Sequence, residues 1–556
     1  MLGATFPALS TRSHALVALL FFAASAAFTV WRNTQVGVLI DIAYPLNTAT
    51  RIAAGDVPYV DFPLAHAPLH FLFQAALIKI VGPSFAVQIA YAAIFSGIAT
   101  ALTYWIAGRL LDGVVPRPRL LAALLSLPLV PLGVYSIYPH PFYDPDACLA
   151  VLAALAAILA ARADPTPRRW ILVGALLTIP VLIKQNIGGA FLVLSVSALA
   201  VEALFRPAAR PGLRWGIAGL AAALGIEVLA IQVVIGVDHF LRWTLSYAME
   251  GRGLSLERIA AFADPRIVWL APLLVAPALA SRLVRPRVRA AAYVALLCLP
   301  AAATLLYSVI LAVPELFPPV LLAASAVAIV RMMRAGPSFE TALPIVLLGT
   351  TLGALMSQGL AGSTFGIFPL LVLAVASLVR EVGRSLPAGS IVAAMTGAVL
   401  SVMLLVSGAA YTLSEDRLEF IDVRAAGPVM RSTYPTLAGL SARGPYLAEL
   451  DEILRWTEAN VPPEDPMAFL PGEDPVFYAL SRRPRLPSVY FFDVANPVSF
   501  EEIVRSADEV GLRWVFVKER IQMTVAPPLN DAYAAALTRG ATLFAEVGPY
   551  RVYRRP

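Results

Sequence analysis

The chain has 556 residues, of which 59% are hydrophobic and 14% are charged, and its mean hydropathy is +0.75. Soluble chains are on average about 45–50% apolar and about 25% charged, so this composition excludes an ordinary soluble enzyme. The net charge of +6 comes from Arg residues in short segments between apolar runs, a pattern that indicates membrane orientation and not nucleic-acid binding. Cys148 and Cys298 lie inside apolar runs, so neither a disulfide framework nor a zinc site is expected.

The apolar runs predict an all-α polytopic membrane protein with about 13 transmembrane helices. Several runs are shorter than the ~20 residues that a bilayer core requires, so their bounds are expected to shift by a few residues. The predicted spans are Ala15–Trp31, Ser84–Gly108, Leu120–Tyr138, Ala147–Ala161, Trp170–Ile183, Ile187–Phe205, Trp215–Val237, Ile267–Ser281, Ala290–Val313, Leu316–Val330, Thr341–Gln358, Phe365–Val379 and Ala388–Tyr411.

Basic residues occur on one side of this arrangement. Arg12 precedes the first span, and a basic cluster follows every second span. The clusters are Arg109, Arg117 and Arg119; Arg162, Arg168 and Arg169; Arg206, Arg210 and Arg214; Arg282, Arg285, Arg287 and Arg289; Arg331 and Arg334; and Arg380 and Arg384. The positive-inside rule therefore predicts a multi-pass protein of the inner (plasma) membrane with a cytoplasmic N-terminus and a periplasmic or extracellular C-terminus.

The composition changes after Tyr411, where apolar runs shorten and charge and proline increase. Strands and helices are expected to alternate in this part, which predicts an α/β domain. The expected strands are Met467–Leu470, Ser488–Phe492 and Trp514–Val517, and the expected helices are Ser499–Val510 and Asn530–Arg539. We therefore expect a transmembrane catalytic domain over residues 1–411 and an extracytoplasmic α/β domain over residues 412–556, the latter serving as a lid or a partner-binding module.

The first outer loop contains the most informative acidic residues. Asp41 lies at the mouth of the first span in an apolar context, which predicts a raised pKa and a role as a base. Asp56 follows Gly55 and is expected to be solvated in a turn. Leu69–Val81 is too short to span a membrane and is expected to be an interfacial or re-entrant helix. Such a loop can form a pocket where a lipid headgroup and a water-soluble substrate meet.

Two later segments add polar residues on the same side. Asp144 and Asp146 precede the next span. For Asp146, helix capping and a functional role are equally good explanations. Lys184 is one of only three lysines and is followed by Gln185 and Asn186. This setting favours anion binding, with a snorkelling interfacial lysine as the alternative.

Metal and nucleotide sites have little support in the sequence. No ligand-spacing motif is present, although several outer side chains could in principle hold a divalent metal. These side chains are His66, His70, His140, His239, Asp41 and Asp61. The chain also lacks a glycine-rich phosphate loop and a dinucleotide fingerprint, so we expect no cofactor.

Several outer segments together resemble the GT-C superfamily of integral-membrane glycosyltransferases, in the branch with the protein mannosyltransferases, the lipid A aminoarabinose transferases and the rhizobial lipopolysaccharide transferases. These segments are Asp41 itself, Gly55–Phe62, Ala67–Leu69, Ile78–Gly82 and Ile183–Asn186. The resemblance covers roughly Ala15 to Phe205; beyond it only the order of many spans and an outer domain agrees. Family members usually have Asp-Glu in the first loop, whereas Ile42 follows Asp41 here, so a second acid either comes from Asp61 or is missing.

The resemblance implies an inverting transfer of a sugar from a polyprenyl phosphate to a hydroxyl of a glycolipid, polysaccharide or protein at the outer membrane face. Asp41 would be the general base, and Lys184 would neutralise the departing phosphate. The supporting residues would be Gln185, Asn186 or His66 beside Lys184, Asp144 orienting the site, and Tyr59 and Tyr143 stacking on a sugar. The sugar, the acceptor and the polyprenol stay open.

A transporter or flippase of a lipid-linked saccharide is the alternative function. Glu227 supports it, because a carboxyl group near the middle of the span Trp215–Val237 is costly. The other acids, however, lie at loop mouths on one side, and the sequence shows neither a repeat nor a pair of broken helices.

Overall fold

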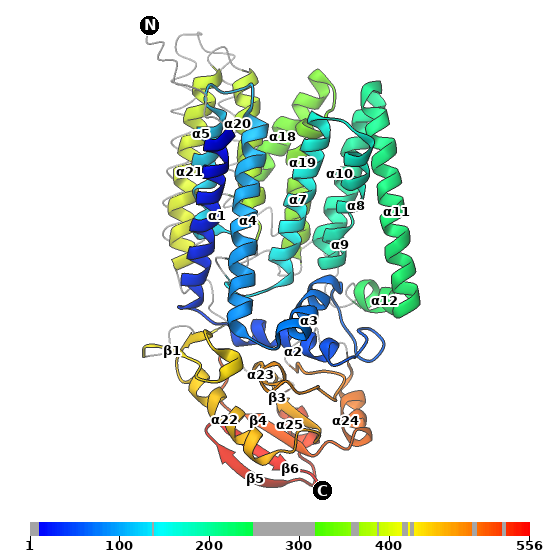
Figure 1. Ribbon diagram of the computed structural model, residues 1–556, viewed down its shortest axis with the longest axis vertical. Coiled ribbons are helices and arrows are strands. Elements are labelled where there is room, and N and C mark those ends of the chain that lie inside the picture. Colours follow the sequence, from blue (N-terminus) through cyan, green and yellow to red (C-terminus); the bar gives the residue numbers. More distant parts are fainter. Residues whose placement is uncertain are drawn as a thin grey trace.

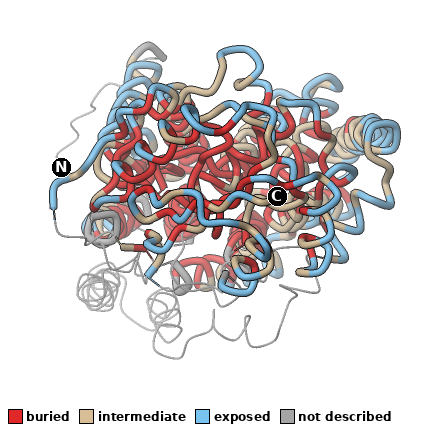
Figure 2. The backbone as a smooth tube through the Cα atoms, turned by 90° about the horizontal axis from the view of Figure 1, so that it is seen from below, coloured by how far each residue is buried: buried red, intermediate tan, exposed pale blue. Residues whose placement is uncertain are grey.

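The computed structural model describes residues 11–135, 138–247, 317–356, 366–385, 389–413, 421–422, 427–491, 498–524 and 530–556. Long helices in these ranges stand side by side as a bundle, and a smaller α/β part lies below one end of it (Figure 1). Seen along the bundle, the buried backbone is concentrated in the middle and the exposed backbone lies around it (Figure 2).

Five of the described helices are long and apolar enough to cross a membrane. They are α1 (Thr11–Asn33), α4 (Phe85–Leu111), α7 (Tyr143–Ala163), α10 (Gln185–Phe205) and α11 (Arg210–Val234). Four further helices of the bundle are α18 (Phe317–Ala335), α19 (Phe339–Met356), α20 (Phe368–Ser385) and α21 (Gly389–Leu413). Each overlaps a predicted span. The total of about 13 stays a prediction, because Ile267–Ser281 and Ala290–Val313 lie outside the described residues.

Two spans that were predicted to be continuous are broken. Leu120–Tyr138 is divided into α5 (Pro118–Ser126) and α6 (Leu129–Leu132), and Trp170–Ile183 into α8 (Pro167–Leu176) and α9 (Ile179–Ile183). Pro128 and Pro180 stand at the two breaks. Proline lacks the N–H for an i→i−4 bond and its ring clashes with the preceding turn, so a helix breaks there.

Close helix packing depends on glycine between α8 and α11. A Cβ on Gly174 would lie 2.1 Å from the carbonyl oxygen of Gly216, and one on Gly219 would lie 2.1 Å from that of Ile171. Only glycine permits this approach of two backbones, as is common between transmembrane helices.

Two helices lie across the end of the bundle, between it and the C-terminal part (Figure 1). They are α2 (Leu39–Ala53), which carries Asp41 in its first turn, and α3 (Leu69–Val81), whose bounds confirm the expected short helix. Short helical turns complete this half of the chain: η1 (Pro207–Ala209), α12 (Val237–Leu241) and the π-helical η2 (Arg242–Ser246). Asp41 therefore sits on a helix and not on a loose loop.

The C-terminal part contains a four-stranded sheet of order β3-β4-β6-β5, in which only the β3–β4 pair is parallel. The strands are β3 (Met467–Leu470), β4 (Trp514–Lys518), β5 (Thr542–Val547) and β6 (Tyr550–Arg554). A separate antiparallel pair is formed by β1 (Val429–Arg431) and β2 (Ser441–Arg443). The helices are η4 (Pro435–Leu437), α22 (Tyr446–Asn460), α23 (Val476–Leu480), α24 (Phe500–Glu509) and α25 (Asn530–Leu537).

The predicted strands Met467–Leu470 and Trp514–Val517 are confirmed, whereas the strand expected at Ser488–Phe492 is wrong over its described residues. The Ser488 hydroxyl donates to the Tyr490 carbonyl oxygen at 2.8 Å and accepts from the Tyr490 N–H at 3.2 Å. This local bonding by a serine competes with a strand ladder.

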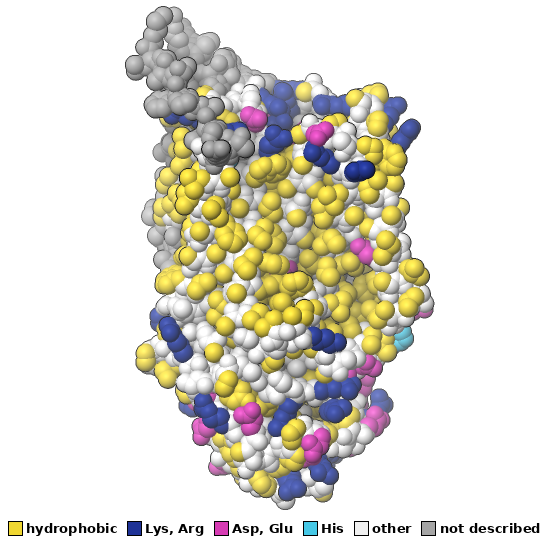
Figure 3. Space-filling view, viewed as in Figure 1, with side chains coloured by type: hydrophobic (Ala, Val, Ile, Leu, Met, Phe, Trp, Pro, Cys, Tyr) yellow, Lys and Arg dark blue, Asp and Glu magenta, His cyan; other side chains and the backbone are white. Residues whose placement is uncertain are grey.

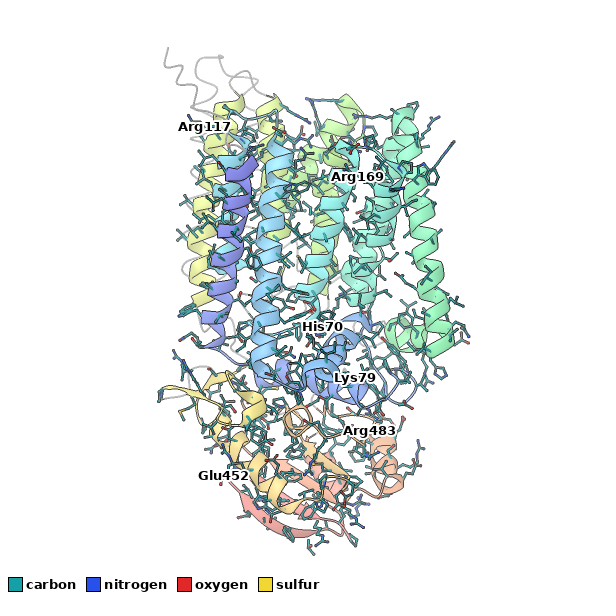
Figure 4. The ribbon with its side chains drawn as sticks, in the orientation of Figure 1. His70, Lys79, Arg117, Arg169, Glu452 and Arg483 are labelled. Carbon is teal, nitrogen blue, oxygen red and sulfur yellow. The ribbon has the colours of Figure 1, made fainter. Side chains whose placement is uncertain are left out.

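Charge is distributed unequally along the molecule. Arg117 and Arg169 lie at the end of the bundle where α1 begins, and His70, Lys79 and Arg483 lie toward the other end (Figure 4). Hydrophobic side chains cover the surface between the two ends (Figure 3). An apolar band flanked by charged ends is what a membrane-embedded bundle requires.

Candidate functional site

Three charged side chains from separate helices come together at the end of the bundle that faces the C-terminal part. Asp41 lies in the first turn of α2, Asp144 in the first turn of α7, and Lys184 at the junction of α9 and α10. The Lys184 Nζ lies 3.6 Å from Asp144 Oδ2, and both side chains are buried. All three were predicted from the sequence, and the structure brings them together.

The surroundings of Asp41 change its acidity. Desolvation and, to a smaller extent, the negative charge of Asp144 together raise the pKa of Asp41 to about 7. The raised pKa that the sequence predicts is therefore present in the structure. Asp41 keeps part of its surface exposed, so a substrate can reach a carboxylate that accepts protons near neutral pH.

Lys184 occupies an unusual position for a cation. It precedes α10 as the N-cap residue, where the helix dipole already places partial positive charge. Its Nζ also lies 4.0 Å from the centre of the Tyr143 ring. The nearby carboxylate of Asp144 offsets part of this positive charge. A cation at the beginning of a 21-residue helix is suited to binding an anion.

Aromatic side chains surround the charged group. The hydroxyl of Tyr44 lies 2.8 Å from Nδ1 of His66, whose ring centre is 4.3 Å from that of Tyr143. Tyr490 reaches in from the C-terminal part, with its ring centre 5.6 Å from that of Tyr44. Tyr44 and Tyr490 were missed by the sequence analysis. The i,i+3 spacing from Asp41 could have revealed Tyr44, whereas no sequence signal marks Tyr490.

The two tyrosines expected to stack on a sugar are both buried. The Tyr59 hydroxyl donates to the His66 carbonyl oxygen at 2.6 Å, and the Tyr59 backbone has a φ of 70°. Tyr143 packs against His66 and stacks on Phe142 with ring centres 4.2 Å apart. The structure therefore favours a supporting role for both rings over stacking on a sugar.

The amide side chains after Lys184 bind the backbone of other segments. Gln185 Nε2 donates to the carbonyl oxygens of Ala65 at 2.8 Å and Thr244 at 3.0 Å. Asn186 Nδ2 donates to the carbonyl oxygen of Gly353 at 2.7 Å. These bonds occupy the donors expected to bind phosphate, so Gln185 and Asn186 hold the first loop and α19 in place.

Asp56 is not the solvated turn residue that the sequence predicts. It is buried, its Oδ2 lies 2.5 Å from Arg51 Nε, and its Oδ1 forms an ion pair with Arg483 of the C-terminal part. Asp61 is exposed and its carboxylate accepts the Val57 N–H at 2.7 Å within its own turn. The structure thus gives Asp56 a structural role and gives Asp61 a local one.

Asp146 has more partners than helix capping requires. Its carboxylate lies 2.6 Å from His70 Nδ1, accepts the Tyr91 hydroxyl at 2.5 Å and also accepts the Tyr135 hydroxyl. All four side chains are buried. This network joins α3, α4 and α7 beneath the site.

The C-terminal part holds α2 at several points, among them its beginning and Asn47. Gln522 Oε1 accepts the Leu39 N–H at 2.8 Å, and its Nε2 donates to the Gly37 carbonyl oxygen at 2.9 Å. Asn47 Nδ2 donates to the Asp474 carbonyl oxygen at 3.0 Å. The first N–H groups of a helix lack partners within it, so Gln522 supplies a cap from a distant segment. These contacts fix the helix that carries Asp41.

Among the residues that the structure describes, no three His, Cys, Asp or Glu side chains gather as a metal-binding group. Neither the sequence nor the described residues thus offer a motif that supports dependence on a divalent metal.

Comparisons with known proteins give similarity to solved structures and none at the level of sequence. No family model matches the chain, and no curated protein is similar to it in sequence. Among solved structures, the chain is similar to ArnT from Cupriavidus metallidurans bound to undecaprenyl phosphate, with 14% sequence identity, a TM-score of 0.42 and coverage of 97% of each chain.

Proposed function

We propose that the chain is an inverting glycosyltransferase that moves a sugar from a polyprenyl phosphate to a hydroxyl group at the outer face of the membrane. The observation that carries the proposal is the grouping of Asp41, with its pKa near 7, beside the buried Asp144–Lys184 pair. The resemblance of the first loops to GT-C glycosyltransferases supports the same reaction. A glycolipid, polysaccharide or protein is the acceptor.

In this reaction Asp41 takes the proton of the acceptor hydroxyl as its oxygen attacks the anomeric carbon of the donor sugar. The bond from that carbon to the phosphate oxygen breaks, and the polyprenyl phosphate leaves with the electron pair. Negative charge grows on the leaving oxygen, and Lys184 with the beginning of α10 stabilises it. The acceptor attacks opposite the leaving group, so the configuration at the anomeric carbon is inverted. Asp41 and Lys184 therefore act from opposite faces of the sugar.

The proposed activity is tested with purified protein in nanodiscs and radiolabelled polyprenyl-phosphate sugars, with cell-envelope glycolipids, polysaccharides and proteins as acceptors. We expect label to move to an acceptor and unlabelled polyprenyl phosphate to appear. If the wild-type protein consumes no lipid-linked sugar with any of these acceptors, the transferase proposal is wrong.

For Lys184 we expect Lys184→Ala to weaken donor use by about tenfold or more at unchanged protein level, because a charge-assisted contact to phosphate is lost. Lys184→Arg should keep part of the activity, since charge survives but the compact ammonium geometry does not. The measurement is transfer rate against donor concentration. Wild-type donor use by the Ala variant would mean that Lys184 does not bind the donor and serves only as the buried partner of Asp144.

We also propose that the Arg-rich end of the bundle is cytoplasmic, by the positive-inside rule. Reporter fusions after Arg117, Arg168 and Arg384 should then report the cytoplasm, and fusions after Asp238 and Pro556 the outer compartment. A cytoplasmic signal at Pro556 would place Asp41 on the wrong side for an outer-face reaction.

One observation favours the transporter as a second candidate. Thr178, at the break between α8 and α9, donates its hydroxyl to Glu227 Oε1 at 2.5 Å. Broken helices and intramembrane carboxyl groups are features of transporters. Movement of labelled lipid-linked sugar across a vesicle membrane without transfer of the sugar would support this candidate.

A further inference from the structure

A cavity of about 780 Å³ lies at the Arg-rich end of the bundle, opposite the end where α2 and α3 lie (Figure 1). The ends of α4, α7, α8, α10, α11, α19 and α20 contribute to its wall. Its charged lining residues are Arg109, Arg162, Arg206, Arg380, Asp112, Glu202 and Glu340, which sum to one net positive charge. Its size falls in the range of small-molecule sites, about 300–1,000 Å³.

The charges of the cavity are unequally paired. Arg162 is fully engaged: its Nη1 lies 2.5 Å from Glu202 Oε2, and its Nε lies 2.9 Å from Glu340 Oε1. In contrast, Nε and Nη1 of Arg380 are buried and have no hydrogen-bond partner among the described residues. Buried guanidinium N–H groups without an acceptor are costly, so an acceptor that the protein does not supply is expected there.

A second buried donor lies in the wall of the same cavity. The Trp170 indole is 7% exposed, and its Nε1 has no hydrogen-bond partner in the described part of the chain. A Cβ placed on Gly212 would lie 2.8 Å from this nitrogen, and Gly212 lines the cavity. The other edge of the indole faces Gly216, which belongs to a smaller apolar pocket between α8, α10 and α11. The N–H edge therefore lies on the Gly212 side of the ring, at the wall of the charged cavity.

The remaining wall is apolar. Its aliphatic lining residues are Leu110, Leu159, Leu199 and Leu213. Trp215 lies at the same wall with 45% of its surface exposed, as is typical of a side chain at a membrane–water interface. A free ion would leave this apolar surface without a partner, whereas a lipid would cover it.

We propose that this cavity binds a phosphate group, supplied by an anionic phospholipid of the adjacent leaflet. The phosphate oxygens accept from Arg380 and from Trp170 Nε1, and the glycerol and proximal acyl carbons lie against the aliphatic wall. Arginine binds phosphate well because its planar fork matches two oxygens. Basic pockets between transmembrane helices are suited to such headgroups. The site is separate from the proposed transfer site and does not depend on it.

The test uses full-length protein delipidated in detergent and titrated with phosphatidylglycerol, phosphatidylcholine or inorganic phosphate. Bound lipid is counted by native mass spectrometry, and the thermal midpoint Tm is followed in parallel. We expect one tightly held phosphatidylglycerol that raises Tm more than phosphatidylcholine does. Arg380→Gln should weaken this binding by roughly tenfold, the size expected for one charge-assisted contact.

Two further variants make the result specific. Arg169→Gln is the matched control: it lies at the same end, is exposed and paired with Asp164 at 2.8 Å, and does not line the cavity, so its lipid binding should equal that of the wild type. Arg109→Gln removes the charge of an exposed residue that lines the cavity. It replaces Arg380→Gln as the test variant if Arg380→Gln does not fold, and it should also bind phosphatidylglycerol more weakly.

Three results would overturn the proposal. The first is equal phosphatidylglycerol binding by the wild type and by both cavity variants. The second is an equal preference of the wild type for phosphatidylcholine. The third is protection by inorganic phosphate as strong as that by phosphatidylglycerol, which would make free phosphate the occupant and overturn the assignment to a lipid.

Discussion

Replacing Asp41 with Asn is expected to slow sugar transfer by about 10²–10⁴-fold while the polyprenyl-phosphate sugar still binds at near wild-type affinity. Asn keeps the shape of the side chain but no longer accepts the proton of the acceptor hydroxyl. The wild-type rate should rise with pH through about 7, where the Asp41 carboxyl loses its proton. Single-turnover transfer and donor binding in nanodiscs separate the two effects. Transfer by Asp41→Asn at the wild-type rate would exclude Asp41 as the base.

The same substitution should stabilise the fold at alkaline pH. The folded-state pKa of Asp41 is about 7, above its ordinary value of 3.8, so the folded protein holds this proton more tightly than the unfolded chain does. The contribution of Asp41 to stability is therefore full below about pH 4 and is lost as the pH rises to 7. The loss is at most about 4 kcal/mol, since one pKa unit corresponds to about 1.4 kcal/mol. Asp41→Asn should have the higher Tm at pH 8, and this difference should shrink at pH 5.

Replacing Asp56 with Asn is expected to destabilise the protein by about 3–5 kcal/mol, because it leaves the buried guanidinium group of Arg51 without its counter-charge. The ion pair between Asp56 and Arg483 of the C-terminal part is lost as well. The measurement is thermal unfolding in nanodiscs.

Asp61→Asn is the matched control for Asp56, since Asp61 is exposed and an amide oxygen can still accept the Val57 N–H. Its effect should stay within about 0.5 kcal/mol. If the two variants unfold at the same temperature as the wild type, the Arg51–Asp56 pair is not a stabilising contact in solution.

The sequence predicts that Asp56 is solvated, whereas the structure shows it buried and paired with Arg51 and Arg483. A Gly-Asp pair is typical of a turn, and this local rule gives no sign of Arg483, which lies more than 400 positions along the chain. The helices of the bundle and the short helix α3 were predictable, because each rests on the composition of one continuous segment. Residues whose partners come from distant segments were not.

The residues of the candidate site also fall into those that the sequence predicts and those that it does not. Asp41 was predictable from its apolar surroundings and Lys184 from the scarcity of lysine, whereas the role of Asp144 came from the family resemblance. Gln185 was predicted to bind the phosphate because it follows Lys184. Its amide instead donates to the carbonyl oxygen of Ala65, which belongs to a distant segment. Tyr490 carries no signal at all, since it reaches the site only through the folding of the C-terminal part.

The attachment of α2 by Gln522 has a consequence for how the protein is made. The two bonded positions, Gly37 and Gln522, are 485 residues apart, so nearly the whole chain is synthesised before this contact can form. At about 5–20 residues per second, the helix that carries Asp41 waits tens of seconds for its cap. A chain that stops short of Gln522 can insert its helices but lacks the contact that fixes Asp41. Synthesis through Gln522 is thus a condition for the contact that orders α2.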